Sequence, residues 1–114
     1  MVQMKVKVGK KTIKVDVADN SIKHFLGLSF SKKKNLLFKM HYEKRWRFWM
    51  FGVSYPIRMV FIDKNKKVID IKDAVPMTNE PKTWKVYRPK IPCKYILETP
   101  LKIKIKIGDK IKFK

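Results

Sequence analysis

The chain has 114 residues and is strongly basic, with 29 Lys and Arg against 9 Asp and Glu and a formal net charge of +20 at pH 7. Its length predicts a single domain over residues 1–114, and its uncharged runs are far shorter than the ~20 residues of a transmembrane helix, so we expect no membrane span. One cysteine and two histidines exclude an internal disulfide framework and leave no typical zinc ligand set, so we expect neither a metal nor another cofactor.

The N-terminal segment predicts a β-hairpin. Apolar and polar residues alternate in VQMKVKV at 2–8 and in IKVDV at 13–17, on either side of a GKK turn. A period of two is typical of a strand with one buried face. A secretory signal would instead show a basic start followed by an unbroken apolar stretch. We therefore expect a cytoplasmic protein.

The next segment holds the one helix that the sequence predicts. The Asp-Asn-Ser sequence at 19–21 supplies candidate N-caps, and Gly27 stands where such a helix would end, so a short helix is expected near residues 20–27. After a basic loop, apolar residues at alternate positions predict a strand over 36–42.

The central stretch RWRFWMFGVSYPIRMVFID, residues 45–63, is rich in aromatic side chains. After Arg47, apolar side chains occupy both alternating sets of positions up to residue 51, which is typical of a strand covered on both faces. A break around Gly52 and Pro56 leads to a strand over 57–62, a turn over 63–67 and a returning strand over 68–71.

The C-terminal part begins with an irregular excursion over 74–92, which four prolines interrupt. Residues 94–98 predict a strand, and LKIKIKI at 101–107 alternates Leu or Ile with Lys before a turn and a last strand at 111–113. Short strands at close spacing predict a mainly β fold, either a small β-sandwich or a partly open barrel, with one short helix near residues 20–27.

Several stretches occur in an order that resembles a known family. They are VDVA at 15–18, GLSF at 27–30, NLLF at 35–38, FWMFGVSYPIRMVFID at 48–63, VIDIKDAVP at 68–76, YILE at 95–98 and IKIGDKI at 105–111. In this order the chain resembles the domain of unknown function family number 192, which is widespread in bacteria and archaea. The resemblance spans nearly the whole chain and implies a small mainly β fold of sandwich or barrel type, without an established activity.

Two positions depart from the pattern of that family. The family usually shows an aspartate two residues after the central proline, where this chain has Arg58, so a role that depends on that carboxylate would be lost or inverted here. The glycine usual in the following turn is replaced by Lys66, which implies a positive φ at a residue with a side chain.

Aromatic and arginine side chains near turns and strand ends suggest a ligand site. Aromatic rings beside arginines suit base stacking and cation–π contacts, and an arginine can hold a carboxylate or phosphate with two hydrogen bonds. The candidate ligand-binding residues are Trp46, Trp49, Tyr55, Arg58, Trp84, Tyr87 and Arg88. The alternative for Trp46 and Trp49 is a place in the core. The alternative for Arg58 is a structural ion pair with Asp70 or Asp73.

Lysines in the two terminal segments form a second candidate surface. If the terminal strands pair, side chains at alternate positions ~6.7 Å apart would build a lysine grid able to follow a phosphate backbone. Its members would be Lys5, Lys7, Lys102, Lys104 and Lys106. The competing interpretation is a solvated face whose lysines deter edge-to-edge aggregation. Abundant Lys and Ile are also typical of proteins from organisms that grow at high temperature, although those usually balance Lys with Glu.

These observations favour a non-catalytic binding module for an anionic small molecule or a nucleic acid, with a monomer as the default state. One alternative is an enzyme of unknown reaction that uses a pocket lined by the central F-W-M segment, with Asp73, His41 or Cys93 as its reactive group. Because no serine lies in a glycine-flanked elbow and no histidine is near Cys93 in sequence, no residue is predicted to be catalytic. A second alternative is a protein-docking module that acts through the excursion 74–92.

Overall fold

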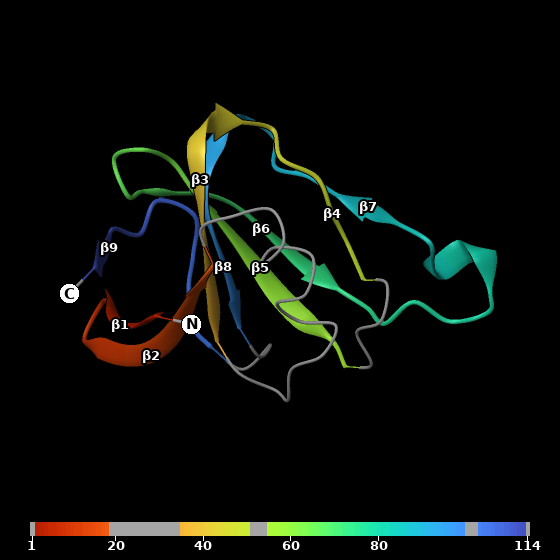
Figure 1. Ribbon diagram of the computed structural model, residues 1–114, viewed down its shortest axis with the longest axis horizontal. Helices are drawn as coiled ribbons and strands as arrows, with labels where there is room; N and C mark the ends of the chain where they lie inside the picture. The colour runs from red at the N-terminus through yellow and green to blue at the C-terminus, as the bar shows by residue number, and fades with distance from the viewer. Residues whose placement is uncertain (1, 19–34, 51–54, 100–102, 114) are drawn as a thin grey trace.

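The computed structural model describes residues 2–18, 35–50, 55–99 and 103–113 (Figure 1). Its elements in chain order are β1 (Val2–Val8), β2 (Lys11–Ala18), β3 (Leu36–Lys44), β4 (Phe48–Trp49), β5 (Ile57–Ile62), β6 (Val68–Ala74), the 3-10 turn η1 (Pro81–Thr83), β7 (Val86–Tyr87), β8 (Cys93–Thr99) and β9 (Ile111–Phe113). Seven of these strands form one sheet in the order β6-β5-β8-β3-β2-β1-β9, and β4 pairs with β7 separately.

The seven-stranded sheet curls into a half-barrel (Figure 1). Neighbouring strands are antiparallel except β2 and β3, which are parallel. Backbone hydrogen bonds join the two ends of the sheet, because Val68 N donates to Asp109 O and Gly108 N donates to Val68 O, both at 2.8 Å. The expected mainly β fold is confirmed, with the partly open barrel as its architecture. The helix expected near residues 20–27 lies outside the described residues.

Alternating side chains build two apolar clusters, one on each face of the sheet. The inner cluster takes residues from all seven strands: Val6, Val8, Val15, Val17, Leu37, Val60, Ile62, Val68, Leu97 and Ile111. The outer cluster comprises Leu36, Phe38, Met40, Met50, Ile57, Met59, Phe61, Ala74, Cys93 and Ile96. Because β5 contributes to both clusters, its sequence IRMVFI is apolar at every position but Arg58.

The small sheet of β4 and β7 covers part of the outer cluster. Phe48 and Tyr87 are half-buried against that cluster, and Met50 is buried within it. Within the described residues 45–50, the strand expected over 45–51 is much shorter than predicted, since there only Phe48 and Trp49 pair with β7. The excursion 74–92 contributes β7 and so covers the sheet, instead of forming a loop without regular structure.

Two expectations about the strands are corrected. Residues 103–107 form no strand. Ile103 is nevertheless buried and Ile105 packs against the inner cluster, so these alternating apolar side chains face the core although their backbone is not paired in a sheet. Cys93, Tyr95 and Leu97 stand at alternate positions, which predicts a small core side chain at Cys93 on the same face as Leu97. Cys93 is buried, but in the outer cluster, whereas Leu97 belongs to the inner cluster. The change of face occurs where the register of β3 and β8 is irregular, next to the pair formed by Lys44 and Cys93.

The turn between β5 and β6 confirms the positive φ expected at Lys66, where φ is 63°. Asp63 Oδ1 accepts hydrogen bonds from the backbone N–H groups of Asn65 and Lys67, both at 2.9 Å. This carboxylate stabilises the turn and offsets part of the cost of a left-handed conformation at a residue with a side chain.

Candidate functional site

A cleft of about 570 Å³ lies where the segment around β7 meets β6 and the residue that follows β3. It is lined by Arg45, Lys72, Lys85, Val86, Tyr87, Arg88, Pro89 and Lys90. Two of the predicted ligand-binding residues, Tyr87 and Arg88, are among them. The other four cationic residues were not predicted, because lysines and arginines occur throughout the chain and nothing in the spacing of these four marks them.

Side chains from the sheet hold the backbone of the cleft wall. Arg45 Nε donates to the carbonyl oxygen of Pro89 at 2.9 Å. Asp70, on β6, is only 3% exposed; its Oδ2 accepts from Lys90 N at 3.0 Å and its Oδ1 from Ile71 N at 2.9 Å. Because backbone N–H groups occupy both of its oxygens, this buried carboxylate fastens the cleft wall to the sheet.

The lining of the cleft is positively charged. Its cationic side chains are Arg45, Lys72, Lys85, Arg88 and Lys90, and none of the eight lining residues is acidic. Asp70 lies beneath, with Oδ2 3.8 Å from Lys72 Nζ. Ammonium and guanidinium groups donate hydrogen bonds and attract anions. The arrangement therefore suits a ligand that carries phosphate or carboxylate groups.

Arg58 lies elsewhere, on β5 opposite Asp73 of β6. Its Nε and Nη2 donate to the two carboxylate oxygens of Asp73 at 2.8 and 3.1 Å, and its Nη1 donates to the carbonyl oxygen of Ile103 at 2.7 Å. The hydrogen bond from Arg58 lowers the pKa of Asp73, against an opposing effect of burial, and it raises the pKa of Arg58. The structural ion pair considered for Arg58 is confirmed, with Asp73 as the partner.

A second hollow, of about 490 Å³, opens beside Arg58 and is lined by Arg58, Lys104, Ile105, Lys106 and Asp109. Each guanidinium nitrogen of Arg58 already donates to Asp73 or Ile103. Asp109 also contributes a carboxylate, whose Oδ2 accepts from Lys106 N at 3.0 Å. This hollow is therefore less suited to an anion than the cleft beside β7.

Three further predicted residues, Trp46, Tyr55 and Trp84, line neither hollow. Trp46 Nε1 donates to the carbonyl oxygen of Tyr42 at 3.1 Å, and the two rings pack with their centroids 5.2 Å apart. Tyr55 is half-buried against the outer cluster. The side chain of Trp49 and all of Lys102 lie outside the described structure. The predicted ligand-binding residues thus do not gather into one pocket.

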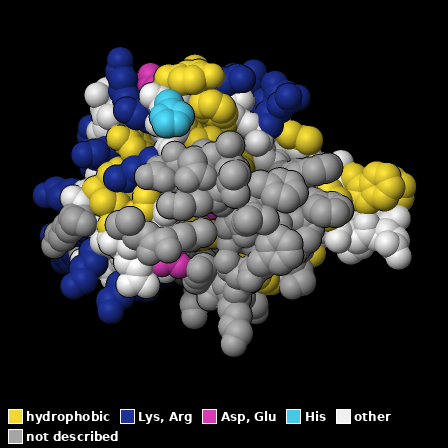
Figure 2. All heavy atoms as spheres, viewed as in Figure 1, with side chains coloured by type: hydrophobic (Ala, Val, Ile, Leu, Met, Phe, Trp, Pro, Cys, Tyr) yellow, Lys and Arg dark blue, Asp and Glu magenta, His cyan; other side chains and the backbone are white. Residues whose placement is uncertain are grey.

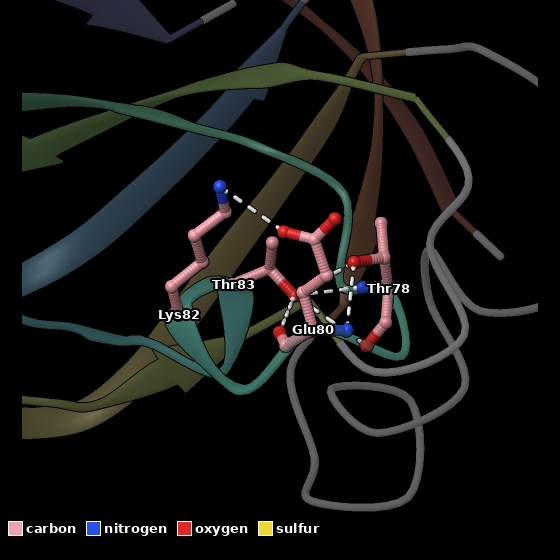
Figure 3. A network of polar contacts seen from close by, with 4 residues as sticks. All are labelled: Thr78, Glu80, Lys82 and Thr83. Atoms are coloured by element: carbon pink, nitrogen blue, oxygen red, sulfur yellow. Dashed lines mark hydrogen bonds and ion pairs between the residues drawn. The ribbon is translucent and has the colours of Figure 1, made fainter.

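Trp84 stands at an exposed tip formed by residues 78–84, which a polar network fixes in place (Figure 3). Thr78 N donates to Thr83 Oγ1, and Thr83 Oγ1 lies 2.8 Å from Glu80 O. Lys82 Nζ is 3.1 Å from a carboxylate oxygen of Glu80. The indole N–H of Trp84 donates to Thr78 O at 2.7 Å, so the ring is held in position although it is 58% exposed.

The lysines of the predicted grid divide between two places. Lys5 and Lys7 are on β1, which pairs with β9 and not with the described part of the 101–107 segment that the grid required, so that expectation is wrong. Lys104 and Lys106 precede β9 and line the hollow beside Arg58. The lysine that pairs with Lys7 across the ladder is Lys112, which the sequence did not single out.

Glu98 is a buried acid that sequence reasoning also missed. It lies on β8 between Leu36 and Met59 of the neighbouring strands and is 2% exposed. Its Oε2 has no hydrogen-bond partner among the described residues. Burial raises the pKa of Glu98 to about 8, so the carboxyl group keeps its proton at neutral pH. The pKa of Tyr55 is raised by burial and, to a lesser extent, by Glu98.

The three groups considered for catalysis do not share a site. Cys93 is buried, and burial is the main cause that raises its pKa to about 12, so its thiol is protonated at neutral pH. Asp73 is bound by Arg58, and His41 is exposed on β3. None of the three lines either hollow.

Over residues 2–18, 35–50, 55–99 and 103–113, no three His, Cys, Asp or Glu side chains are grouped so that they could hold a metal ion. In the same part of the chain, no helix has the length and apolar character needed to cross a membrane.

Comparison with known sequences identifies close relatives. The family model DUF192, described as "Uncharacterized ACR, COG1430", matches residues 4–113. A UPF0127 protein of Pyrococcus furiosus is 35% identical over 112 residues, which cover 90% of each chain. A UPF0127 protein of Pyrococcus horikoshii is 37% identical over 106 residues, covering 87% of this chain and 86% of that protein.

Two solved structures share the fold. A candidate transcription regulator from Sinorhizobium meliloti has a TM-score of 0.85 at 18% identity, covering 98% of this chain and 94% of that chain. A protein of unknown function from Novosphingobium aromaticivorans has a TM-score of 0.78 at 20% identity, covering 97% and 84%. At such low identities the likeness shows the fold alone. The family match and the archaeal relatives confirm the resemblance seen in the sequence: the chain belongs to the uncharacterised DUF192 (UPF0127) family.

Proposed function

We propose that this protein is a non-catalytic binding module whose cleft beside β7 receives an anionic ligand. The observation that carries the proposal is the convergence of five cationic side chains on one hollow of about 570 Å³, with no acidic residue among the described residues that line it. Like charges brought together repel one another, and an anion placed among them offsets that repulsion.

The cleft wall is suited to recognition because it is fixed before a ligand arrives. Asp70 holds the backbone at Lys90 and Arg45 holds it at Pro89, so the three cationic side chains of the segment 85–90 project from an anchored backbone. An anchored segment loses less conformational entropy on binding than a free loop does. Val86 and Tyr87 add apolar surface, which favours an organic anion with a small apolar part.

Calorimetric titration with inorganic pyrophosphate and with citrate, at low ionic strength, tests the proposal. The informative variant is Lys85→Gln/Arg88→Gln, because both side chains line the cleft and neither bonds to another described residue. We expect the wild type to bind at least one of the two anions and the variant to bind it about tenfold or more weakly, which is about 1.4 kcal/mol.

The matched control is Lys64→Gln/Lys82→Gln, which removes the same charge from the β5–β6 turn and from the exposed tip. We expect this control to bind like the wild type. Equal weakening in both double variants would show general attraction by net charge and contradict a site in the cleft. Failure of the wild type to bind either anion would also contradict it.

A second candidate function, docking of another protein, is favoured by apolar side chains exposed along the excursion 74–92. They are Val75, Trp84, Val86 and Ile91. Figure 2 shows hydrophobic side chains at the right-hand tip, where Figure 1 places η1. Because the network around Thr78 and Thr83 fixes this tip, Trp84 is presented on a rigid support.

Pull-down experiments with the wild type and with Trp84→Ser test the docking function. A partner that binds through the tip should be retained by the wild type and lost from the variant. The control is Ile107→Ser, which removes an exposed apolar side chain outside the excursion. Docking through the tip is contradicted when Trp84→Ser retains the same partners as Ile107→Ser.

A further inference from the structure

We propose that the outer face of β2, β1 and β9 binds the phosphate backbone of double-stranded nucleic acid without reading its base sequence. This surface is separate from the cleft beside β7, and the proposal does not depend on a ligand in that cleft. Its central residues, called here the lysine face, are Lys5, Lys7, Lys14 and Lys112.

The ladder places these lysines opposite one another. Lys5 of β1 is the partner of Lys14 on β2, and Lys7 of β1 is the partner of Lys112 on β9. Val6, between the two lysines of β1, is fully buried in the inner cluster, so the lysines point to the outer side. Side chains are ~5 Å apart across the ladder and ~6.7 Å apart along a strand. Four ammonium groups thus share one compact area.

This arrangement costs stability, because like charges directly opposite each other destabilise a sheet. No ion pair joins a lysine of this face to any residue that the structure describes. Asp109 lies beside the face, but its Oδ2 accepts a hydrogen bond from the backbone of Lys106. Asp16 also points outward on β2, so the face carries one carboxylate beside its four lysines, and a bound polyanion would offset the remaining positive charge.

Protection of a free sheet edge does not explain every lysine of this face. Lysines often protect an edge strand from pairing with another chain. However, β9 pairs with β1 over Val6–Val8, so Lys7 lies on a stretch with a partner strand on both sides. Lys5 and Lys14 lie beyond the described second pairings, since β3 pairs with β2 over Asp16–Ala18. Protection of a sheet edge therefore does not account for Lys7.

Further lysines extend the face at one end. Lys10, at the turn between β1 and β2, and Lys110, before β9, are exposed beside the outward lysines. Lys11 is exposed as well, but it pairs with the inward-facing Val8. A shallow hollow of about 310 Å³ here is lined by Lys7, Gly9, Asp109, Lys110 and Lys112. In Figure 2, Lys and Arg side chains crowd the left margin, where Figure 1 places β9, β1 and β2.

The composition of the face favours a duplex over a single strand. The outward residues of β1, β2 and β9 around the lysines are Gln3, Thr12 and Asp16, and none is aromatic. Proteins that bind single strands combine basic grooves with aromatic rings on which bases stack. Double-stranded DNA instead offers one phosphate charge per ~1.7 Å of helix axis, which lysines can neutralise without base contacts.

Fluorescence anisotropy of a short labelled DNA duplex of mixed sequence, titrated over a salt series, tests this proposal. If the four lysines neutralise four phosphates, the log–log slope of affinity against salt should be about −3.6. Replacing two of them in Lys5→Gln/Lys14→Gln should weaken binding at low salt and reduce the slope to about −1.8. The Lys64→Gln/Lys82→Gln control should keep the wild-type slope.

The cleft variant Lys85→Gln/Arg88→Gln separates this proposal from the function proposed above, because it should retain duplex affinity. Loss of duplex binding in the cleft variant, with none in Lys5→Gln/Lys14→Gln, would overturn the lysine face as the binding surface. Equal loss in all three double variants, or tighter binding of the matching single strand, would overturn it as well. Since Lys5→Gln/Lys14→Gln relieves repulsion, its melting temperature should be at least that of the wild type, which shows that the variant remains folded.

Discussion

The carboxyl group of Glu98 lies between apolar residues of the outer cluster, with Oε2 unpartnered among the described residues. Burial removes the hydration that an ionised carboxylate needs, so the pKa of Glu98 rises from its ordinary value of 4.5 to about 8. In the unfolded chain the pKa returns to the ordinary value. Folding therefore takes up a proton between these two pH values.

We predict that the protein loses stability as the pH rises through this window. The folded chain binds more protons than the unfolded chain, so the free energy of unfolding falls by up to about 1.4 kcal/mol per pH unit and levels off above about pH 8. Glu98→Gln removes the titrating group and should flatten this dependence. Urea unfolding at several pH values measures both proteins, and identical pH profiles would refute the raised pKa.

At the scale of elements, alternation locates most strands but not their partners. The expected hairpin at the N-terminus and the strand over 57–62 correspond to β1, β2 and β5. Residues 101–107 alternate just as regularly, yet their described part forms no strand. The ladder position beside β1 is taken by β9, and Gly108 and Asp109 bond instead to Val68 on β6. These contacts join residues far apart in sequence. The alternation of apolar and polar residues within one segment does not indicate which distant segment it will pair with.

The same reason limits prediction of the candidate site. Its cationic side chains come from the end of β3, from β6 and from the segment around β7. Only Tyr87 and Arg88 carried a local signal, an aromatic beside an arginine in a proline-rich context. Lys72 lies in an ordinary strand sequence, and its place in the cleft depends on where the segment 85–90 folds back.

The side chain of Arg58 holds the segment 103–109, which has no strand pairing of its own. We predict that Arg58→Met loosens the segment 103–109, because it removes the bond to the Ile103 carbonyl and both bonds to Asp73. The cost should be about 1–2 kcal/mol, since the pair is partly exposed to solvent. Amide hydrogen exchange at Val68 and Gly108, which join the sheet ends, should accelerate.

The control for that experiment is Asp73→Asn, which keeps a hydrogen-bond acceptor and the bond from Arg58 to Ile103. It should cost less stability and change exchange at Gly108 less. If both variants leave the exchange of Val68 and Gly108 as in the wild type, Arg58 does not tether the segment.

At the scale of the whole molecule, the charge of +20 is confined to a body with extents of 38 × 28 × 28 Å. The Debye length is about 30 Å at 0.01 M ionic strength, so charges repel across the entire molecule, whereas at 0.15 M it is about 8 Å and only neighbours interact. Repulsion of this kind opposes folding at low salt. Screening and bound anions both relieve it, but only bound anions depend on particular side chains.

Thermal unfolding in sodium chloride and in sodium sulfate at matched ionic strength distinguishes the two effects. We predict that the melting temperature rises with either salt and rises further in sulfate. An anion that binds the folded state stabilises it, and this stabilisation grows with the anion concentration relative to its dissociation constant. Sulfate also strengthens burial of apolar surface in every variant alike. The extra increment should therefore shrink in Lys85→Gln/Arg88→Gln and in Lys5→Gln/Lys14→Gln, but persist in Lys64→Gln/Lys82→Gln. Equal increments in all four proteins would mean that anions act only by screening and exclusion, and that neither the cleft nor the lysine face holds them.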